Sequence, residues 1–215
     1  MPCTCLDVFQ NGPQDVSRVK FIDAERPECV CEAEKVSPYS DPVRPDEMLV
    51  RLVVDPIHIH YENGVARLRN SFFSDSSSVG SSCLRKEYAR RDEYEATIEA
   101  MLKSSPKASD GSARKLYGVV LVAVADVKKI MHEIEVKVDP ASNSASVTKQ
   151  EIQGFCVYGT GEQDRPSHTD IMVNGVNRVS NSKARRAQER LTKAVTAQLM
   201  TVDQFRDVAD LTAWS

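Results

Sequence analysis

Ile57-His58-Ile59-His60-Tyr61-Glu62-Asn63-Gly64-Val65-Ala66-Arg67-Leu68-Arg69 is the stretch from which the fold of this chain is best predicted. Its Asn63-Gly64 dipeptide separates two runs of alternating apolar and polar residues. A type I′ turn needs positive φ at both central positions, which Asn-Gly supplies, so residues 57–69 are predicted to form a β-hairpin. The predicted register pairs Glu62 with Val65, Tyr61 with Ala66, His60 with Arg67 and Ile59 with Leu68.

The two faces of this hairpin differ in chemistry because side chains alternate along a strand. One face collects Ile57, Ile59, Tyr61, Ala66 and Leu68, and the other collects His58, His60, Arg67 and Arg69. Two guanidinium groups would repel a divalent cation, so metal binding by His-x-His is disfavoured. Guanidinium groups match phosphate or carboxylate oxygens, so we predict that Arg67, Arg69 and the nearby Ser71 bind an anion.

Histidines beside such an anion could transfer a proton. We therefore predict catalytic roles for His58, His60 and His168, on the condition that the fold brings His168 to the hairpin. Thr169 and Asp170 follow His168 and could orient its ring. The alternative is that the histidines and arginines form the solvated face of an ordinary antiparallel hairpin.

The composition is that of one globular domain. The chain has 215 residues, of which 41% are hydrophobic and 27% charged, and its net formal charge of −3 argues against a protein whose whole surface binds nucleic acid. We expect a cytoplasmic protein without membrane contact, because no apolar run could span a bilayer and no signal-peptide pattern is present. The six cysteines are then expected to be thiols or metal ligands rather than disulfides.

Residues 1–46 are expected to form an irregular, acidic, proline-rich arm that could bind a protein partner. The arm contains two Cys-x-Cys pairs, formed by Cys3 with Cys5 and Cys29 with Cys31. Four thiolates could hold a tetrahedral zinc ion, although the usual spacing in such sites is Cys-x₂-Cys. The alternative is four unligated thiols in a loose segment.

Residues 47–215 are predicted to form a single α+β domain with a central, mostly antiparallel sheet. Residues 47–54 are rich in aliphatic residues and predict a strand, and helices are expected near 84–102 and 182–200. The 182–200 helix is basic and could contact phosphates or a protein partner. Cys156 lies in an apolar strand and is expected to be an unreactive buried thiol.

Several short motifs resemble those of a group of small bacterial proteins without an assigned activity. They are Arg69-Asn-Ser71-Phe-Phe73, Ser82-Cys-Leu-Arg85 and Arg165-Pro-Ser-His168-Thr-Asp-Ile171, which stand in the order of that group's Ser-Ser-Ala-Phe, Ser-Val-Asp and Asn-Pro-Ala-His-Ala motifs. The resemblance does not cover the residues before 47, and it points to polar positions that include His168.

Two functions are compatible with these observations. The first is a small bacterial cytosolic protein that binds a phosphate-bearing ligand, such as a nucleotide or nucleic acid, and catalyses its transfer or hydrolysis with the predicted histidines and arginines. The second is a non-catalytic accessory subunit of a multi-protein system, with or without a zinc ion bound by its cysteines. Convergence of the three histidines in one pocket would favour the first.

Overall fold

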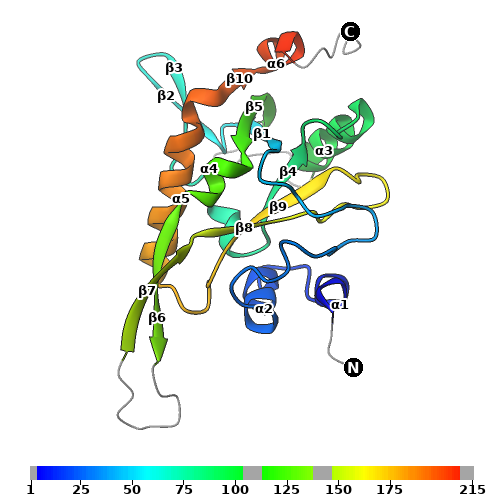
Figure 1. The fold of residues 1–215 in the computed structure, drawn as a ribbon. Helices are drawn as coiled ribbons and strands as arrows, with labels where there is room; N and C mark the ends of the chain where they lie inside the picture. Colours follow the sequence, from blue (N-terminus) through cyan, green and yellow to red (C-terminus); the bar gives the residue numbers. More distant parts are fainter. Residues whose placement is uncertain (1–3, 104–112, 138–146, 209–215) are drawn as a thin grey trace.

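The computed structural model describes residues 4–103, 113–137 and 147–208, shown in Figure 1. The helices are α1 (Cys5–Asn11), α2 (Arg18–Glu25), α3 (Arg91–Lys103), α4 (Val124–Lys128), α5 (Asn181–Val195) and α6 (Val202–Val208), with 3-10 turns η1 (Ser74–Ser77) and η2 (Thr196–Gln198). The strands are β1 (Met48–Asp55), β2 (Ile59–Glu62), β3 (Val65–Leu68), β4 (Ser81–Arg85), β5 (Lys115–Ala123), β6 (Met131–Lys137), β7 (Val147–Gln153), β8 (Phe155–Tyr158), β9 (His168–Val173) and β10 (Leu199–Thr201).

A six-stranded antiparallel sheet forms the centre of the molecule, with strand order β10-β5-β1-β4-β9-β8. Two separate hairpins, β2–β3 and β6–β7, accompany it. The predicted α+β fold and the predicted strand at 47–54 are therefore confirmed.

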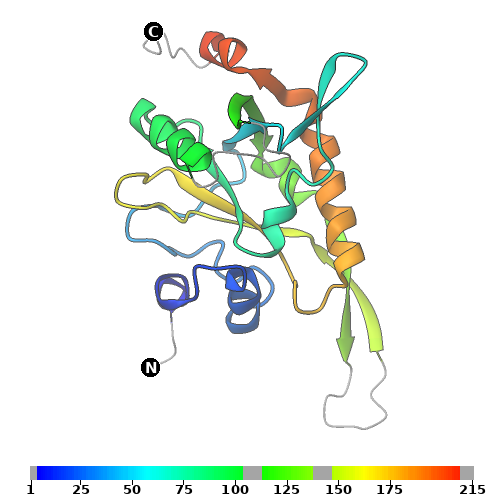
Figure 2. The same cartoon turned by 180° about the vertical axis from the view of Figure 1, so that it is seen from behind.

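Each face of the sheet carries its own hydrophobic layer, because alternate residues of a strand point to opposite faces. One face packs against α5 and the two hairpins, and its core includes Val53, Ile171 and Leu191. The opposite face is covered in two parts. Helices α3 and α6 cover the β1–β5 side. The described part of residues 1–46, which we call the N-terminal segment and which contains α1 and α2, covers the β8–β9 side (Figures 1 and 2).

The β2–β3 hairpin has the predicted register in all four residue pairs. Asn63 and Gly64 adopt φ values of 51° and 78°, as a type I′ turn requires. Ile59 and Leu68 are buried as expected, but Tyr61 is 56% exposed. The base of the hairpin therefore packs into the core, whereas its turn end is exposed.

The helix predicted at 84–102 is partly wrong, because its first residues belong to β4, and α3 begins at Arg91. Strand β4 lies between β1 and β9 and pairs with both, so long-range pairing determines its conformation. The helix predicted at 182–200 is confirmed as α5, which ends at Val195 and is followed by η2 and β10.

The N-terminal segment was expected to be irregular, and this prediction is wrong for its first half. A capping box between Thr4 and Asp7 begins α1, and α2 follows. Val8, Phe9, Val19 and Ile22 pack with Cys156, Tyr158 and Met172 of the sheet, together with Cys31 and Val36. The described part of the segment is thus built into the domain.

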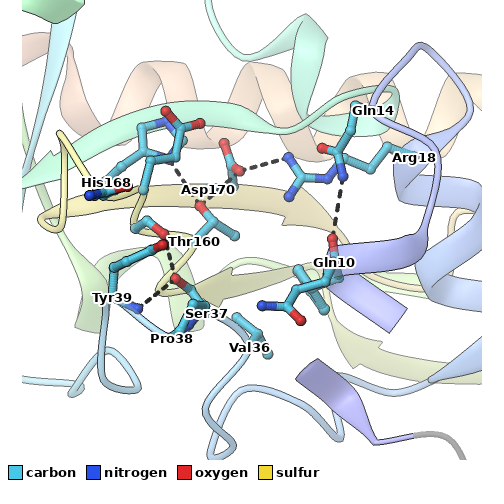
Figure 3. Close-up of a pocket in the computed structure, with 14 residues that line it drawn as sticks. Gln10, Gln14, Arg18, Val36, Ser37, Pro38, Tyr39, Thr160, His168 and Asp170 are labelled. Carbon is cyan, nitrogen blue, oxygen red and sulfur yellow. Dashed lines mark hydrogen bonds and ion pairs between the residues drawn. The ribbon is translucent and has the colours of Figure 1, made fainter. Parts of the chain in front are cut away.

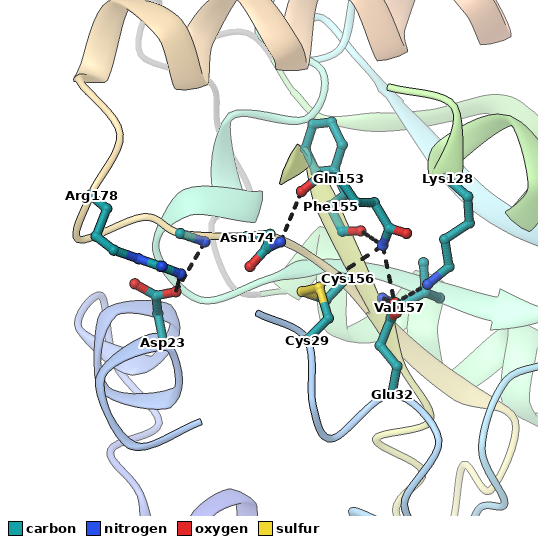
Figure 4. Close-up of a disulfide and its surroundings, with 11 residues drawn as sticks. Asp23, Cys29, Glu32, Lys128, Gln153, Phe155, Cys156, Val157, Asn174 and Arg178 are labelled. Carbon is teal, nitrogen blue, oxygen red and sulfur yellow. Dashed lines mark hydrogen bonds and ion pairs between the residues drawn. A yellow bond between two sulfur atoms is a disulfide. The ribbon is translucent and has the colours of Figure 1, made fainter. Parts of the chain in front are cut away.

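Two disulfides hold this segment, which corrects the expectation that the cysteines are thiols or metal ligands. Cys5 is bonded to Cys31, and Cys29 is bonded to Cys156 of β8 (Figure 4). The zinc site predicted from Cys3, Cys5, Cys29 and Cys31 is incompatible with these bonds, because a sulfur in a disulfide is not a thiolate ligand. Cys3 itself lies outside the described residues.

Beside the second disulfide, Glu32 accepts a hydrogen bond from the Val157 backbone and pairs with Lys128. Cys29, Glu32 and Cys156 form the one group of possible metal ligands in the described part of the chain, and two of the three are bonded to each other. This donor set does not fit a zinc ion while the disulfide is intact.

No described helix is long and apolar enough to cross a membrane.

We expect the Cys29–Cys156 bond to stabilise the fold more than the Cys5–Cys31 bond. It spans 127 residues of sequence against 26, and closing a longer loop removes more entropy from the unfolded chain. Urea unfolding of Cys29→Ser/Cys156→Ser should show a loss of about 2–5 kcal/mol, larger by about 1.4 kcal/mol than that of Cys5→Ser/Cys31→Ser. Equal stability of both variants and the native protein in non-reducing buffer would contradict the pairing.

Candidate functional site

A polar pocket of about 340 Å³ lies between the N-terminal segment and the β8–β9 region. Figure 3 shows residues from these two parts facing one another across it. The N-terminal segment contributes Phe9, Gln10, Gln14, Arg18 and residues 36–39, and the other side contributes residues 160–163, His168 and Asp170.

Asp170 is the centre of this pocket and is only 1% exposed. Strand alternation directs Asp170 to the same face as Met172, which packs under the N-terminal segment. Its carboxylate accepts hydrogen bonds from Arg18 Nη1 at 3.2 Å, Thr160 Oγ1 at 2.9 Å and Ser82 Oγ at 3.3 Å. Ser82 is the direct cross-strand partner of Asp170 on β4. A buried carboxylate needs such donors, because an unpaired charge is costly to desolvate.

The turn before β4 must contain glycine to leave room for Asp170. Gly80 has φ of 105°, a conformation that L side chains rarely adopt. A Cβ at this position would lie 3.0–3.1 Å from side-chain atoms of Asp170. The backbone therefore approaches the carboxylate closely on this side.

Thr160 connects His168 to Asp170. The Thr160 hydroxyl lies 3.1 Å from His168 Nδ1 and 2.9 Å from Asp170 Oδ2. Its single proton is donated to the carboxylate, which can only accept, so the hydroxyl must accept a proton from Nδ1–H of His168. This assignment, which follows from the hydrogen-bond network, leaves Nε2 of neutral His168 as an acceptor.

His168 and Arg18 each have a side-chain nitrogen that lacks a hydrogen-bond partner among the described residues. Nε2 of His168 has no hydrogen-bond partner among the described residues. Arg18 donates through Nη1 to Asp170 and lies over the Phe9 ring, but its buried Nε has no partner in the described chain. Polar groups left unpaired beside a cavity are suited to hydrogen bonds with a ligand.

Charges in the pocket are balanced. Arg18 pairs with Asp170, and Glu162, which lines the rim, pairs with Arg165. The remaining polar wall is made of amides and hydroxyls, and Phe9, Val36, Pro38 and Tyr39 supply apolar surface. The pocket thus offers hydrogen bonds rather than net charge.

Of the predicted site residues, the structure places His168 in this pocket and the rest elsewhere. His60, Arg67 and Ser71 are exposed, and the hairpin lies at the opposite end of the molecule from α1 and α2 (Figures 1 and 2). Arg67 pairs with Glu62 at 2.6 Å. Arg69 donates through Nε to the carbonyls of Pro56 and Ile59, which holds its guanidinium against the base of the hairpin.

The alternation predicted that His58 and His60 lie on the same face of the hairpin, and this prediction is wrong. It turns inward at the base of the hairpin, where Nδ1 accepts a hydrogen bond from the Val54 backbone at 3.1 Å and the ring meets Phe72 edge-on. Burial, followed by the nearby Arg51 charge, lowers the pKa of His58 to about 3. The three predicted histidines therefore do not converge.

Two residues of this pocket, Thr160 and Arg18, were not predicted from the sequence. Thr160 lies in the loop Gly159-Thr-Gly161, whose glycines marked it as irregular but gave no role to the hydroxyl. Arg18 lies in the segment expected to be a loose arm, and no local pattern connects it with Asp170, 152 residues away.

Comparisons with protein-family models, curated proteins and solved structures gave no match. The motif resemblance to small bacterial proteins therefore stays a prediction. The geometry of the pocket is the basis for a function.

Thr160→Val should destabilise the protein by about 2 kcal/mol, because it leaves Asp170 and Nδ1 of His168 buried with fewer partners. Thr97→Val is a matched control, since Thr97 is as buried but its hydroxyl donates only to the Glu93 carbonyl of the same helix. Urea unfolding should show less than about half the loss in the control. Equal losses would mean that the hydroxyl does not link the pair.

His58 should make stability depend on acid pH. Its folded pKa of about 3 lies below the ordinary histidine pKa of 6.5, so between these values the unfolded chain binds a proton that the folded protein does not. The stabilisation is complete above pH 6.5 and is lost as the pH falls towards 3, by up to about 1.4 kcal/mol per pH unit.

His58→Asn keeps an acceptor for the Val54 N–H but does not titrate. Unfolding free energies measured across this pH range should fall less steeply in His58→Asn than in the native protein. His60→Asn on the exposed hairpin is the control and should follow the native curve. Parallel curves for all three proteins would contradict the burial of a neutral His58.

Proposed function

We propose that the protein binds a small, uncharged, hydroxyl-rich molecule in the Asp170 pocket and that His168 acts as a base towards one of its hydroxyls. The observation that carries this proposal is the His168–Thr160–Asp170 chain in the wall of the cavity, which fixes the ring and leaves Nε2 without a partner among the described residues. The expected small-molecule site with a histidine acid or base is thereby retained, with a different location and ligand.

The charge balance supports an uncharged ligand. Arg18 and Asp170 neutralise each other, so a phosphate or carboxylate would meet no uncompensated cation in the pocket. Displacing Asp170 from Arg18 to bind an anion would leave a carboxylate buried without its charged partner. The cost of that step disfavours the phosphate-bearing ligand at this site.

The hydrogen-bonding groups support hydroxyls in particular. The pocket offers donors on Arg18 and on glutamine amides, and acceptors on His168 Nε2 and on glutamine carbonyls. A hydroxyl donates and accepts, so a molecule with several hydroxyls can satisfy both kinds of group, whereas a carboxylate only accepts. Tyr39 and Phe9 offer flat apolar surface for the carbon skeleton.

The proton chemistry follows from the same chain. A ligand hydroxyl that donates a hydrogen bond to Nε2 becomes a better nucleophile, because His168 can take its proton as the hydroxyl oxygen forms a new bond, and the ring then becomes an imidazolium. Nδ1–H would still be donated to Thr160, and the Asp170 carboxylate would stabilise the new charge through the Thr160 hydroxyl.

The compartment belongs to the same proposal. Structural disulfides form and persist in oxidising surroundings. Two disulfides among the described cysteines therefore support an oxidising compartment in place of the cytoplasmic location expected from the sequence.

Backbone-amide NMR with neutral monosaccharides and their uronic acids tests the ligand class. Each pair differs by one carboxylate, so the neutral sugar should shift the amides of residues 160–163 and the uronic acid should shift them several-fold less. Sugars at about 10 mM would occupy most sites if Kd is near 1 mM. His168→Gln should weaken the neutral-sugar shifts, while His60→Gln, on the exposed hairpin, should leave them unchanged.

Two results would overturn the proposal. One is the absence of shifts at residues 160–163 with every neutral sugar tested. The other is stronger binding of the uronic acids than of the neutral sugars, which would show that the pocket prefers anions.

A further inference from the structure

A second cavity, of about 460 Å³, lies between α5 and the start of β6, away from the Asp170 pocket. It is lined by His132, Glu133, Lys183, Arg186, Glu189, Arg190 and Lys193, and we call it the α5 groove. Four of these side chains are cations and two are carboxylates, so its formal charge is +2 in a protein whose total is −3. The α5 groove is therefore opposite in sign to the molecule as a whole.

The cations follow one stripe of the helix. Lys183, Arg186, Arg190 and Lys193 are spaced by three or four residues, which places them on one side of α5 over about 15 Å. Both carboxylates already have cationic partners, Glu133 with Lys183 and Glu189 with Arg185. Arg190 donates to the Met131 carbonyl and is held against β6.

Arg186 and Lys193 remain uncompensated. Both are exposed, and neither has an ion-pair or hydrogen-bond partner among the described residues. This distinguishes them from the hairpin arginines, which are bonded to groups of their own hairpin. The stripe thus has free cations at its middle and at its C-terminal end.

His132, in the wall of the α5 groove, is a second feature that indicates a ligand, independent of the cations on α5. It is 5% exposed, and neither ring nitrogen makes a hydrogen bond of normal geometry with a described residue, although the Asn174 backbone lies near enough to favour the protonated ring. Burial lowers the pKa of His132, so the ring is neutral and still carries one N–H that lacks an acceptor. Leaving such a donor unpaired costs about 1–3 kcal/mol, which an oxygen entering the α5 groove would recover after a small movement of the ring.

We infer that the α5 groove binds a ligand carrying two or more phosphate groups, with Arg186 and Lys193 as the principal contacts and His132 as a donor from the groove wall. Guanidinium and ammonium groups bind phosphate oxygens through charge-assisted hydrogen bonds. A stripe of about 15 Å is too long for one orthophosphate to use, which favours several linked phosphates.

The same phosphate chemistry occurs in inorganic polyphosphate and in the backbone of a nucleic acid. Among the described residues no phenylalanine, tyrosine or tryptophan lines the α5 groove, and His132 is buried, so the bases of a nucleic acid would find little stacking surface there. Binding would then be independent of base sequence and strongly dependent on salt.

Titration with sodium tripolyphosphate, sodium orthophosphate and a single-stranded oligonucleotide of about 12 nucleotides tests the inference. Tripolyphosphate should bind the native protein at low salt, and orthophosphate should bind far more weakly. Arg186→Ala/Lys193→Ala should weaken tripolyphosphate binding about tenfold, and loss of two contacts should reduce the salt slope of oligonucleotide binding by about 1.4. His132→Leu should weaken tripolyphosphate binding several-fold.

The charge-matched control is Arg67→Ala/Arg91→Ala. It removes two exposed arginines that are already paired, Arg67 with Glu62 of the same hairpin and Arg91 with Glu95 of the same helix, and it should change binding by less than about twofold. Tighter binding of the oligonucleotide than of tripolyphosphate would identify a nucleic-acid backbone as the source of the phosphates, and the reverse order would identify a small polyphosphate. The inference is overturned if the native protein binds neither probe, or if the groove variant binds as well as the control.

Discussion

The buried carboxylate of Asp170 is the interaction on which the arrangement of this molecule depends. Its donors come from three separate parts of the chain, Arg18 on α2, Ser82 on β4 and Thr160 after β8. A carboxylate that is 1% exposed is tolerable only with all of these contacts, so its burial requires the N-terminal segment, the sheet and the loop to meet at one point. The same requirement creates the pocket, because the groups that stabilise Asp170 also line it.

The docked N-terminal segment is therefore part of the site. It contributes one wall of the pocket, while the Cys29–Cys156 bond and the cluster around Phe9 and Met172 hold it on the sheet. A segment held by a covalent bond and a hydrophobic cluster cannot open locally without losing both, which keeps Arg18 in place at little cost when a ligand binds. This preorganisation explains how a pocket on short helices and loops can be well defined.

The features that the sequence predicted are those determined by nearby residues. The register of β2–β3 follows from Asn63-Gly64, and α5 follows from its apolar spacing, because both depend on contacts within a few residues. The predictions that were wrong concern features that depend on residues far away in the sequence. Cys29 pairs with a cysteine 127 positions away, and β4 is a strand because β1 and β9 flank it. His168 was identified as a polar residue in a loop, but its connection to Thr160 and Asp170 required the fold.

The hairpin arginines show why exposed charge alone is a weak criterion for a binding site. The hairpin arginines looked like an anion clamp, yet each is bonded to a group of its own hairpin, so a ligand would gain only the difference between two similar interactions. The sites proposed here contain groups whose hydrogen bonds are incomplete, namely Nε2 of His168, Nε of Arg18 and the ring of His132. An incomplete bond in a fixed position gives a ligand a gain that water or a neighbouring side chain has not already supplied. An unsatisfied polar group at the edge of a cavity therefore offers a ligand more than a charge that is already paired.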